Sequence, residues 1–220
     1  QKAYHAVEDA GFKLSQLDGA EVGCYVGVMN HGYSLLTLRS EEQNPPSSLF
    51  WSIANRVSYQ LNWTGPSFAI DSACSSSLTA MHTAVNALQN GDCRLALVGG
   101  VNVIVHPKQY DVLCQQHMLS SDGICRPFAK GANGFVDGEG VVALLLMPFS
   151  EAKKTNRRIY GVIEGSSLNA GGKANGYTAP NPSAQSKLIA KALDRAERKP
   201  SDISYIEAHG TGTELGDPIE

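Results

Sequence analysis

The sequence lacks the two features that would place it on a membrane or on nucleic acid. Its longest uncharged run, Ser72 to Gly91, is rich in Ser, Thr, Asn and Gln, whereas a membrane-spanning helix needs about 18 or more consecutive apolar residues. The N-terminus carries no apolar signal region. Like charges do not cluster beyond pairs such as Lys153 and Lys154, and the net charge is only −3. We therefore expect a soluble, cytoplasmic protein that binds neither nucleic acid nor an anionic membrane.

Cysteines are few and follow no disulfide or metal pattern. An odd number at irregular spacing, in a chain long enough to fold without cross-links, argues against a disulfide framework. Cys114 and His117 form one CxxH pair, but no second pair lies nearby to complete a zinc site. Most of the five are expected to be small buried thiols. They are Cys24, Cys74, Cys93, Cys114 and Cys125.

Short apolar runs alternate with stretches of helical periodicity along the chain. Several runs are continuously apolar, which is typical of strands covered on both faces. Helical spacing occurs at the N-terminus, over 74–90 and over 184–198. This order predicts α/β layers. The expected strands are GCYVGVM near residue 25, PSFAID ending at 71, LALVGGVNVIV from 95, VVALLLM to 147, IYGVIEG from 159 and SYIEA to 208.

The size of the chain allows more than one structural half. A chain of 220 residues that is 42% hydrophobic can bury one sizeable core or two small ones. The polar, basic segment 151–158 follows Pro148 and is the best candidate for a connection. It divides residues 1–150 from residues 159–220.

One cysteine stands at the start of an uncharged helix. A strand pattern ends at Asp71, the small residues Ser72 and Ala73 permit a tight turn, and apolar residues then recur at helical spacing from Cys74 to Gly91. Without charged residues, the helix is expected to be buried nearly all round. Unpaired N–H groups and the positive end of the helix dipole favour a thiolate at its start. The layout is that of a nucleophile elbow, so Cys74 is either the nucleophile or a small core residue.

A cysteine nucleophile needs a partner, and His209 is the best placed of the six histidines. It follows the expected strand SYIEA and opens the string HGTGTELGDP, whose glycines let the backbone approach a ligand closely. His82 lies inside the uncharged helix and is expected to be a hydrogen-bonded core residue. The loop has no dinucleotide-binding spacing, and the sequence has no phosphate-binding loop motif. The histidines without a supporting motif are His5, His31, His106 and His117.

Three separated strings resemble the signature blocks of the β-ketoacyl synthase family, in particular ketosynthase domains of modular polyketide synthases. They are DSACSSSL around Cys74, NGFVDGEG at 133–140 and EAHGTGTELGDP from Glu207, in the order of the family. The strings FWSIANRVSYQLNWTGPS and VHPKQY resemble ketosynthases of assembly lines whose acyltransferase is a separate protein. The resemblance covers essentially all 220 residues. Further matching strings are GGVNV at 99–103, LSSDGICRPF at 119–128 and NGYTAPNPSAQ at 175–185.

The departures from the family pattern are modest. Ser72 stands where Thr is usual, Asn133 and Phe135 stand where Asp and Tyr are usual, and Asp137 stands where Arg is common. None of these differences removes a catalytic group. Ser72 flanks the nucleophile, where a changed side chain is expected to alter the packing.

The resemblance implies a thiolase-like fold, in which two related βα halves stack in five αβαβα layers. Cys74 would lie on the central helix of the N-terminal, nucleophile-bearing half, 1–150, and His209 in the beginning of the C-terminal half, 159–220. The family's second histidine and a lysine belong to a block that follows the HGTGT segment. We therefore expect the chain to be truncated at both ends and to cover roughly half of a ketosynthase domain. Such domains work as homodimers among the other domains of a multimodular synthase.

The resemblance also implies a decarboxylative Claisen condensation. Cys74 would take an acyl chain from the phosphopantetheine thiol of an acyl carrier protein, and malonyl on a second carrier would then lose carbon dioxide and attack the thioester. The backbone N–H of Cys74 would supply one oxyanion donor, and an imidazole N–H of His209 would steady the malonyl thioester oxygen. No cofactor or metal is expected to bind the domain directly.

Two other functions stay open from the sequence. A non-condensing ketosynthase keeps the cysteine and acts as a module that binds and relays acyl chains without elongating them. A papain-like cysteine hydrolase has a similar separation between its Cys and His, here 135 residues from 209 minus 74. The local signature of such a hydrolase, CGSC followed by an aromatic residue, is missing.

Overall fold

The computed structural model describes residues 1–30, 32–37, 49–174, 176 and 179–220, so His31 and part of the string NGYTAPNPSAQ lie outside the described residues. The chain divides into two compact units that interleave in the sequence. The first is Gln1–His106 with Gly138–Val162, and the second is Pro107–Asp137 with Ile163–Glu220.

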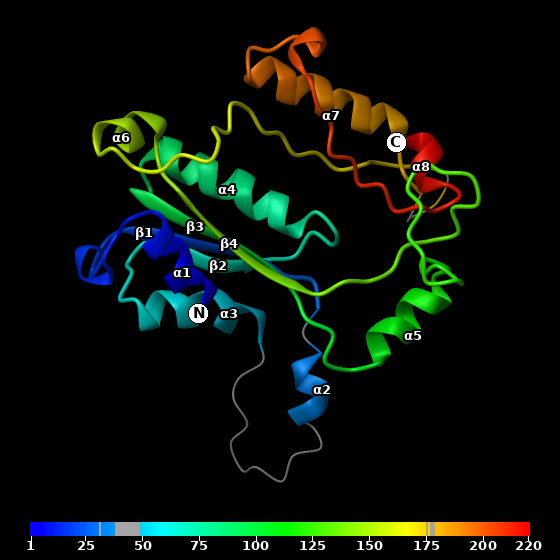
Figure 1. Cartoon of the computed structure of the whole chain (residues 1–220), viewed down its shortest axis with the longest axis horizontal. Helices are drawn as coiled ribbons and strands as arrows, with labels where there is room; N and C mark the ends of the chain where they lie inside the picture. Colours follow the sequence, from blue (N-terminus) through cyan, green and yellow to red (C-terminus); the bar gives the residue numbers. More distant parts are fainter. Residues whose placement is uncertain (31, 38–48, 175, 177–178) are drawn as a thin grey trace. The chain divides into compact units, whose positions relative to one another are not determined.

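The elements alternate between helix and strand in the first unit, as the sequence predicts (Figure 1). That unit contains α1 (Lys2–Asp9), η1 (Leu14–Gln16), β1 (Val22–Gly27), α2 (Tyr33–Thr37), α3 (Phe50–Gln60), β2 (Ser67–Ile70), α4 (Ser76–Asn90), β3 (Leu95–Asn102), β4 (Gly140–Leu146) and α6 (Phe149–Lys154). The second unit contains α5 (Lys108–Gln115), α7 (Pro182–Arg195), η2 (Pro200–Asp202) and α8 (Gly216–Ile219). No helix in the described part of the chain is long and apolar enough to cross a membrane.

A four-stranded sheet organises the first unit, in the order β2-β1-β3-β4. β1 runs parallel to both of its neighbours, whereas β4 is antiparallel to β3. Gly27 at the end of β1 pairs with Ile70 at the end of β2 and with Gly100 of β3. The carboxyl ends of three strands therefore meet at one edge of the sheet, the position where open α/β sheets place their sites.

Helices cover both faces of this sheet (Figure 1). On one face, Val7 of α1 and Ala54 of α3 pack with the buried side chains of β1 and β3. On the other face, α4 packs through a stripe of small residues against Tyr25, Ala96 and Val98. β1 is buried along its whole length, as the continuous apolar pattern predicts. The stripe of α4 is Ser76, Ala80, Ala84 and Ala87.

Glycines let α4 lie directly on the sheet. A Cβ at Gly27 would come within 2.4 Å of the backbone nitrogen of Ser77, and a Cβ at Gly100 would lie 3.1 Å from the Ser77 Cβ. Both values are below ordinary van der Waals contact, so the first turn of α4 can pack this closely only against a strand without side chains there.

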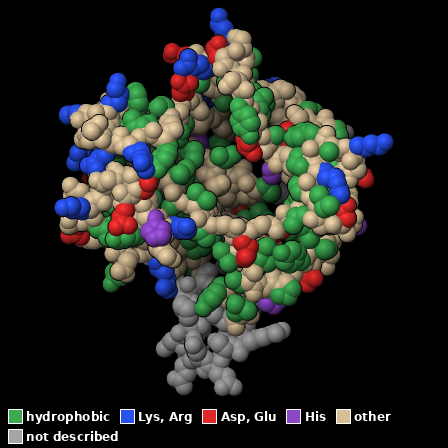
Figure 2. Space-filling view, viewed as in Figure 1, with side chains coloured by type: hydrophobic (Ala, Val, Ile, Leu, Met, Phe, Trp, Pro, Cys, Tyr) green, Lys and Arg blue, Asp and Glu red, His purple; other side chains and the backbone are tan. Residues whose placement is uncertain are grey.

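The expectation that the uncharged helix is buried nearly all round is wrong for this structure. Leu78 on α4 is 66% exposed, because the sheet of the first unit contacts mainly the stripe of small residues, with Met81 and Leu88 packed beside it. The edge strand β4 is also open on the α4 side, where Val142 is 61% exposed. Figure 2 shows hydrophobic side chains reaching the surface over much of the displayed face.

The described residues of the second unit form helices but no strand, and two expected strands, the first of which begins in the first unit, are missing. α7 confirms the helix predicted over 184–198: it begins at Pro182, and the side chain of the N-cap residue Asn181 accepts the N–H of Ala184 at 3.2 Å. The segments IYGVIEG and SYIEA form no strand in the described residues. β-branched and aromatic residues favour a strand only where another strand is available to pair. These two segments pair with no other strand among the described residues.

Candidate active site

The segment around Cys74 is a strained turn between β2 and α4, called here the nucleophile turn (residues 71–75). Ala73 has a φ of +55°, a left-handed conformation that costs a residue with a Cβ about 1–2 kcal/mol. Its N–H donates to Oδ1 of Asp71 at 2.9 Å, which fixes the turn locally. Strain of this kind persists where the surroundings hold it, and it is common at functional sites.

Hydroxyl groups tie the nucleophile turn to the first two turns of α4. The Ser72 Oγ lies 3.1 Å from the Ser75 Oγ and 2.7 Å from the Thr79 Oγ1. The Ser76 Oγ accepts the N–H of Ser72 at 3.0 Å and donates to the carbonyl oxygen of Ala73 at 2.5 Å. Ser72, one of the residues that depart from the family pattern, thus joins this network through its side chain and its backbone.

The five cysteines fall into two groups, and none forms a disulfide. Cys24 and Cys93 are buried, and burial raises the pKa of the Cys24 thiol to about 11. That thiol is neutral at physiological pH and serves as packing. Cys74 is exposed, as a nucleophile must be, but so are Cys114 and Cys125. The prediction that most cysteines are small buried thiols is therefore wrong, since only two of the five are buried.

The segment around His209 lies in the second unit and is held by carboxylates; residues 209–213 are called here the histidine loop. The Glu220 carboxylate accepts the N–H of His209 at 2.6 Å and the N–H of Gly210 at 2.9 Å. Gly210 and Gly212 have φ of +54° and +67°, which glycine adopts without strain. A Cβ at Gly212 would also lie 3.1 Å from the carbonyl oxygen of Gly134.

Asp217 joins the histidine loop to two other signature strings. Its buried carboxylate accepts the N–H of Gly212 at 2.9 Å and the N–H of Phe128 at 2.6 Å. The N–H of Gly134 in turn donates to the carbonyl oxygen of Gly212 at 2.8 Å. Phe128 has a φ of +57°, so Asp217 anchors a second strained residue. The strings LSSDGICRPF, NGFVDGEG and EAHGTGTELGDP thus meet beside one carboxylate.

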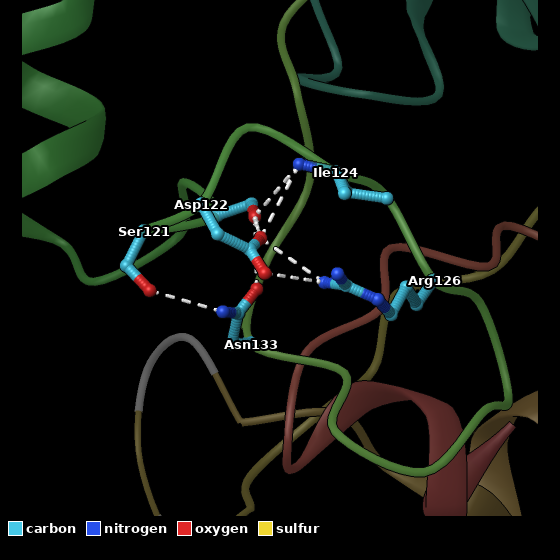
Figure 3. A network of polar contacts seen from close by, with 6 residues as sticks. Ser121, Asp122, Ile124, Arg126 and Asn133 are labelled. Atoms are coloured by element: carbon cyan, nitrogen blue, oxygen red, sulfur yellow. Dashed lines mark hydrogen bonds and ion pairs between the residues drawn. The ribbon is translucent and has the colours of Figure 1, made fainter.

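A polar network orders the string LSSDGICRPF within the second unit (Figure 3). The Asp122 carboxylate accepts the hydroxyl of Ser120 at 2.8 Å and forms an ion pair with Arg126 at 2.8 Å. The Ser120 hydroxyl and the Arg126 guanidinium hold the pKa of Asp122 below its usual value. Asn133, which replaces the usual Asp, donates from its amide to the Ser121 Oγ at 3.0 Å. A carboxylate could not make that donation, so this departure is accommodated by a contact of its own.

His82 and the metal-binding residue types show no catalytic or metal-binding arrangement in the described residues. The ring Nε2 of His82 lies 3.1 Å from the Asn86 Nδ2, one turn along α4, in line with the expected hydrogen-bonded role. The described residues contain no group of three His, Cys, Asp or Glu side chains arranged to hold a metal ion. Cys74 belongs to the first unit and His209 to the second.

Sequence reasoning missed the residues that support the two candidates. Asp217 and Glu220 lie in or beside the string EAHGTGTELGDP, and the sequence alone gives them no specific role, because an acid near a Gly-rich loop has many uses. Ser76 lies in DSACSSSL, where it reads as one small residue among three. The signal in the sequence is a polar side chain near a special backbone conformation, three residues away for Ser76, five for Asp217 and ten for Glu220. Several polar side chains satisfy that condition, and only the three-dimensional structure shows which of them reaches the backbone.

The edge where parallel strands end, the strained turn with an exposed cysteine and the uncharged helix on the sheet are features of an α/β fold of the thiolase-like class, with a candidate nucleophile at a strand-to-helix turn. Two family models then match almost the whole chain: "Beta-ketoacyl synthase, N-terminal domain" over residues 1–152 and "Beta-ketoacyl synthase, C-terminal domain" over residues 160–220. The chain belongs to the β-ketoacyl synthase family.

Curated relatives are polyketide synthases that are far longer than this chain. Polyketide synthase PksM of Bacillus subtilis (strain 168) is 48% identical over 100% of the chain and 5% of its own length. Polyketide synthase ThaG of Burkholderia thailandensis is 49% identical over 100% of the chain and 4% of its length. The chain thus spans about one-twentieth of the length of these relatives.

Solved ketosynthase structures share the fold over nearly the whole chain. The oxazolomycin ketosynthase domain OzmH KS7 of Streptomyces albus JA3453 has a TM-score of 0.94 at 45% identity, covering 99% of this chain and 38% of its own. The ketosynthase from module 6 of the bacillaene synthase of Bacillus subtilis 168 has a TM-score of 0.91 at 42% identity, covering 98% and 38%. These matches confirm the α/β, thiolase-like fold class.

Proposed function

We propose that the natural polypeptide carrying this sequence is a β-ketoacyl synthase that performs decarboxylative condensation in polyketide biosynthesis, with Cys74 as its nucleophile. The observation that carries the proposal is the strained, solvent-exposed nucleophile turn at the carboxyl end of β2, in a chain matched by both family models. A strained strand-to-helix turn of this kind exposes the side chain of its nucleophile to a substrate.

In the first step, the Cys74 thiolate attacks the thioester carbonyl of an acyl chain carried on phosphopantetheine. The carbonyl oxygen becomes an oxyanion, which the backbone N–H of Cys74 stabilises as a donor already in place. The carbon–sulfur bond to the carrier then breaks, and the departing pantetheine thiolate takes up the proton that left Cys74. The acyl chain is left on the protein as a thioester.

In the second step, malonyl on an acyl carrier protein loses carbon dioxide, and the electron pair of the broken bond forms an enolate. We assign His209 to this step, as an imidazole N–H donor to the thioester oxygen where the negative charge develops. The enolate carbon attacks the Cys74 thioester, the carbon–sulfur bond breaks and the thiolate is restored. The chain grows by two carbons. The carboxylates that fix the histidine loop support this assignment, since a donor of this kind needs a fixed position.

The setting follows from the same proposal. We place the protein in the cytoplasm as a homodimer within a multimodular synthase, with acyl carrier proteins as partners and no cofactor of its own. The strings FWSIANRVSYQLNWTGPS and VHPKQY support the kind of assembly line whose acyltransferase is a separate protein. We divide the sequence into a nucleophile-bearing half, 1–150, a connection, 151–158, and the beginning of a C-terminal half, 159–220.

The test uses the natural polypeptide that carries these 220 residues, incubated with an acyl carrier protein bearing a short acyl chain and then with malonyl carrier protein. We expect an acyl adduct on Cys74, release of carbon dioxide and a product longer by two carbons, each followed by mass spectrometry. Cys74→Ala should abolish the adduct, while Cys125→Ala, at another exposed cysteine, should leave it unchanged.

The outcomes separate the alternatives. An adduct on Cys74 without carbon dioxide or product would identify a relay module that binds acyl chains without condensing them. An adduct that persists in Cys74→Ala would remove the assignment of the nucleophile.

A further inference from the structure

We propose that the buried hydroxyl of Ser76 positions the backbone N–H of Cys74, the donor to which the proposed function assigns the acyl oxyanion; the inference rests on that function. Ser76 is only 4% exposed, whereas Ser75 and Ser77 on either side of it are exposed. A hydroxyl buried at this depth normally satisfies a specific partner. Ser76 has two partners, and both lie in the nucleophile turn.

The Ser76 hydroxyl holds the turn from both sides of the strained residue. It accepts the N–H of Ser72 at 3.0 Å and donates to the carbonyl oxygen of Ala73 at 2.5 Å. The backbone N–H of Ser76 reaches the same carbonyl oxygen at 3.1 Å. Ala73, with its φ of +55°, is therefore held in the left-handed conformation by the residue three positions later.

The Ala73 carbonyl and the Cys74 N–H belong to one planar peptide unit. In a trans peptide these two groups point in opposite directions, and this peptide is trans. Because the carbonyl is held toward the first turn of α4, the N–H of Cys74 is directed away from that turn. Hydrogen bonds on the carbonyl also polarise the peptide and strengthen its N–H as a donor. The Ser76 side chain thus sets both the direction and the strength of the oxyanion donor.

The experiment compares two reactions of the same thiol in the natural polypeptide. Transfer of an acyl group from an acyl carrier protein develops an oxyanion, whereas alkylation by iodoacetamide attacks a saturated carbon and develops none. We expect Ser76→Ala to slow acylation of Cys74 by about 10- to 100-fold at saturating substrate, with little change in KM. Alkylation should stay within about two-fold of the unaltered protein, because the thiol itself is not touched.

Ser77→Ala is the matched control, since it makes the same change on the next residue of the same helical turn, where the side chain is exposed. If acylation in Ser76→Ala equals that in Ser77→Ala, the inference is overturned. It is also overturned if alkylation slows in parallel with acylation, because Ser76 would then act through the thiol rather than through the N–H.

Two further measurements test the inference if Ser76→Ala does not fold or if the unaltered protein is not acylated. If Ser76→Ala does not fold, the pair Ser76→Thr and Ser76→Val replaces it, because the two side chains have the same shape and only Thr keeps the hydroxyl. Thr should then acylate faster than Val, and equal rates overturn the inference. If the unaltered protein is not acylated at all, the proposed function fails instead. Hydrogen exchange of the Cys74 amide then decides: faster exchange in Ser76→Ala than in Ser77→Ala supports the positioning role, and equal exchange overturns it.

Discussion

The nucleophile turn and the histidine loop both carry a candidate residue on irregular backbone, but they are held in different ways. The nucleophile turn follows a strand of the sheet, precedes a helix packed on that sheet and is fixed mainly by neutral hydroxyls, with the Asp71 carboxylate accepting one N–H, that of Ala73. The histidine loop follows a segment that forms no strand, and two carboxylates hold its backbone N–H groups. The nucleophile turn therefore depends mainly on steric fit and neutral hydrogen bonds, and the histidine loop on two charged acceptors.

The difference has a physical consequence for how each region fails. The close packing of a helix against a sheet does not depend on pH, but it tolerates almost no added side-chain volume. Where one carboxylate accepts two backbone N–H groups, replacing it by the amide of the same shape removes one of the two hydrogen bonds, because the amide has a single acceptor oxygen. Steric substitutions should damage the nucleophile turn, while isosteric loss of charge should damage the histidine loop.

The largest effect is expected at Gly27, beneath the nucleophile turn. A Cβ there would come within 2.4 Å of the Ser77 backbone nitrogen, and backbone cannot rotate away as a side chain can. Gly27→Ala should lower the free energy of unfolding by about 3 kcal/mol and slow acylation of Cys74, as measured by chemical denaturation and by adduct formation. Gly138→Ala is the control, because no atom lies within 4 Å of a Cβ at that glycine. Equal stability of the two variants would contradict the steric account.

A smaller effect is expected at Asp217, whose carboxylate holds the histidine loop. Asp217→Asn keeps the shape of the side chain but leaves one of two N–H groups, that of Gly212 or that of Phe128, facing an amide NH₂. Loss of one such buried bond should cost about 1–3 kcal/mol of unfolding free energy, with carbon dioxide release reduced more than acylation of Cys74. Glu214→Gln, an exposed acid three residues away, should change neither quantity. A variant that loses acylation and carbon dioxide release equally would show that Asp217 acts on the whole fold instead.

The comparison also explains how far the sequence could predict this protein. The β1, β2, β3 and β4 runs, the helix after Cys74 and the helix near 184–198 follow from apolar periodicity and turn residues, which act locally. The exposed face of α4 and the missing strands at 159–165 and 204–208 could not be predicted, because burial and strand pairing depend on which other elements are present. The candidate residues Cys74 and His209 stand out by chemistry and position. Ser76, Asp217 and Glu220 do not, since their importance lies in which backbone atom each one reaches.

The smallest effect is expected from acid on the network around Asp122. Its pKa is lowered by the Ser120 hydroxyl and the Arg126 guanidinium, so the folded state binds a proton less readily than the unfolded chain does. The contribution of this network to stability is therefore fully present above the unfolded pKa of about 4 and is lost as the pH falls through the lower, folded value. The Ile124 amide, which donates to Asp122 Oδ1 at 3.3 Å, should shift in NMR spectra over this range, and Asp122→Asn should remove the shift. The Ser72 amide, which donates to a neutral hydroxyl in the nucleophile turn, should not follow the same titration. If both amides titrate together, a charged group also acts on the hydroxyl network of the nucleophile turn, and that turn is not held mainly by neutral contacts.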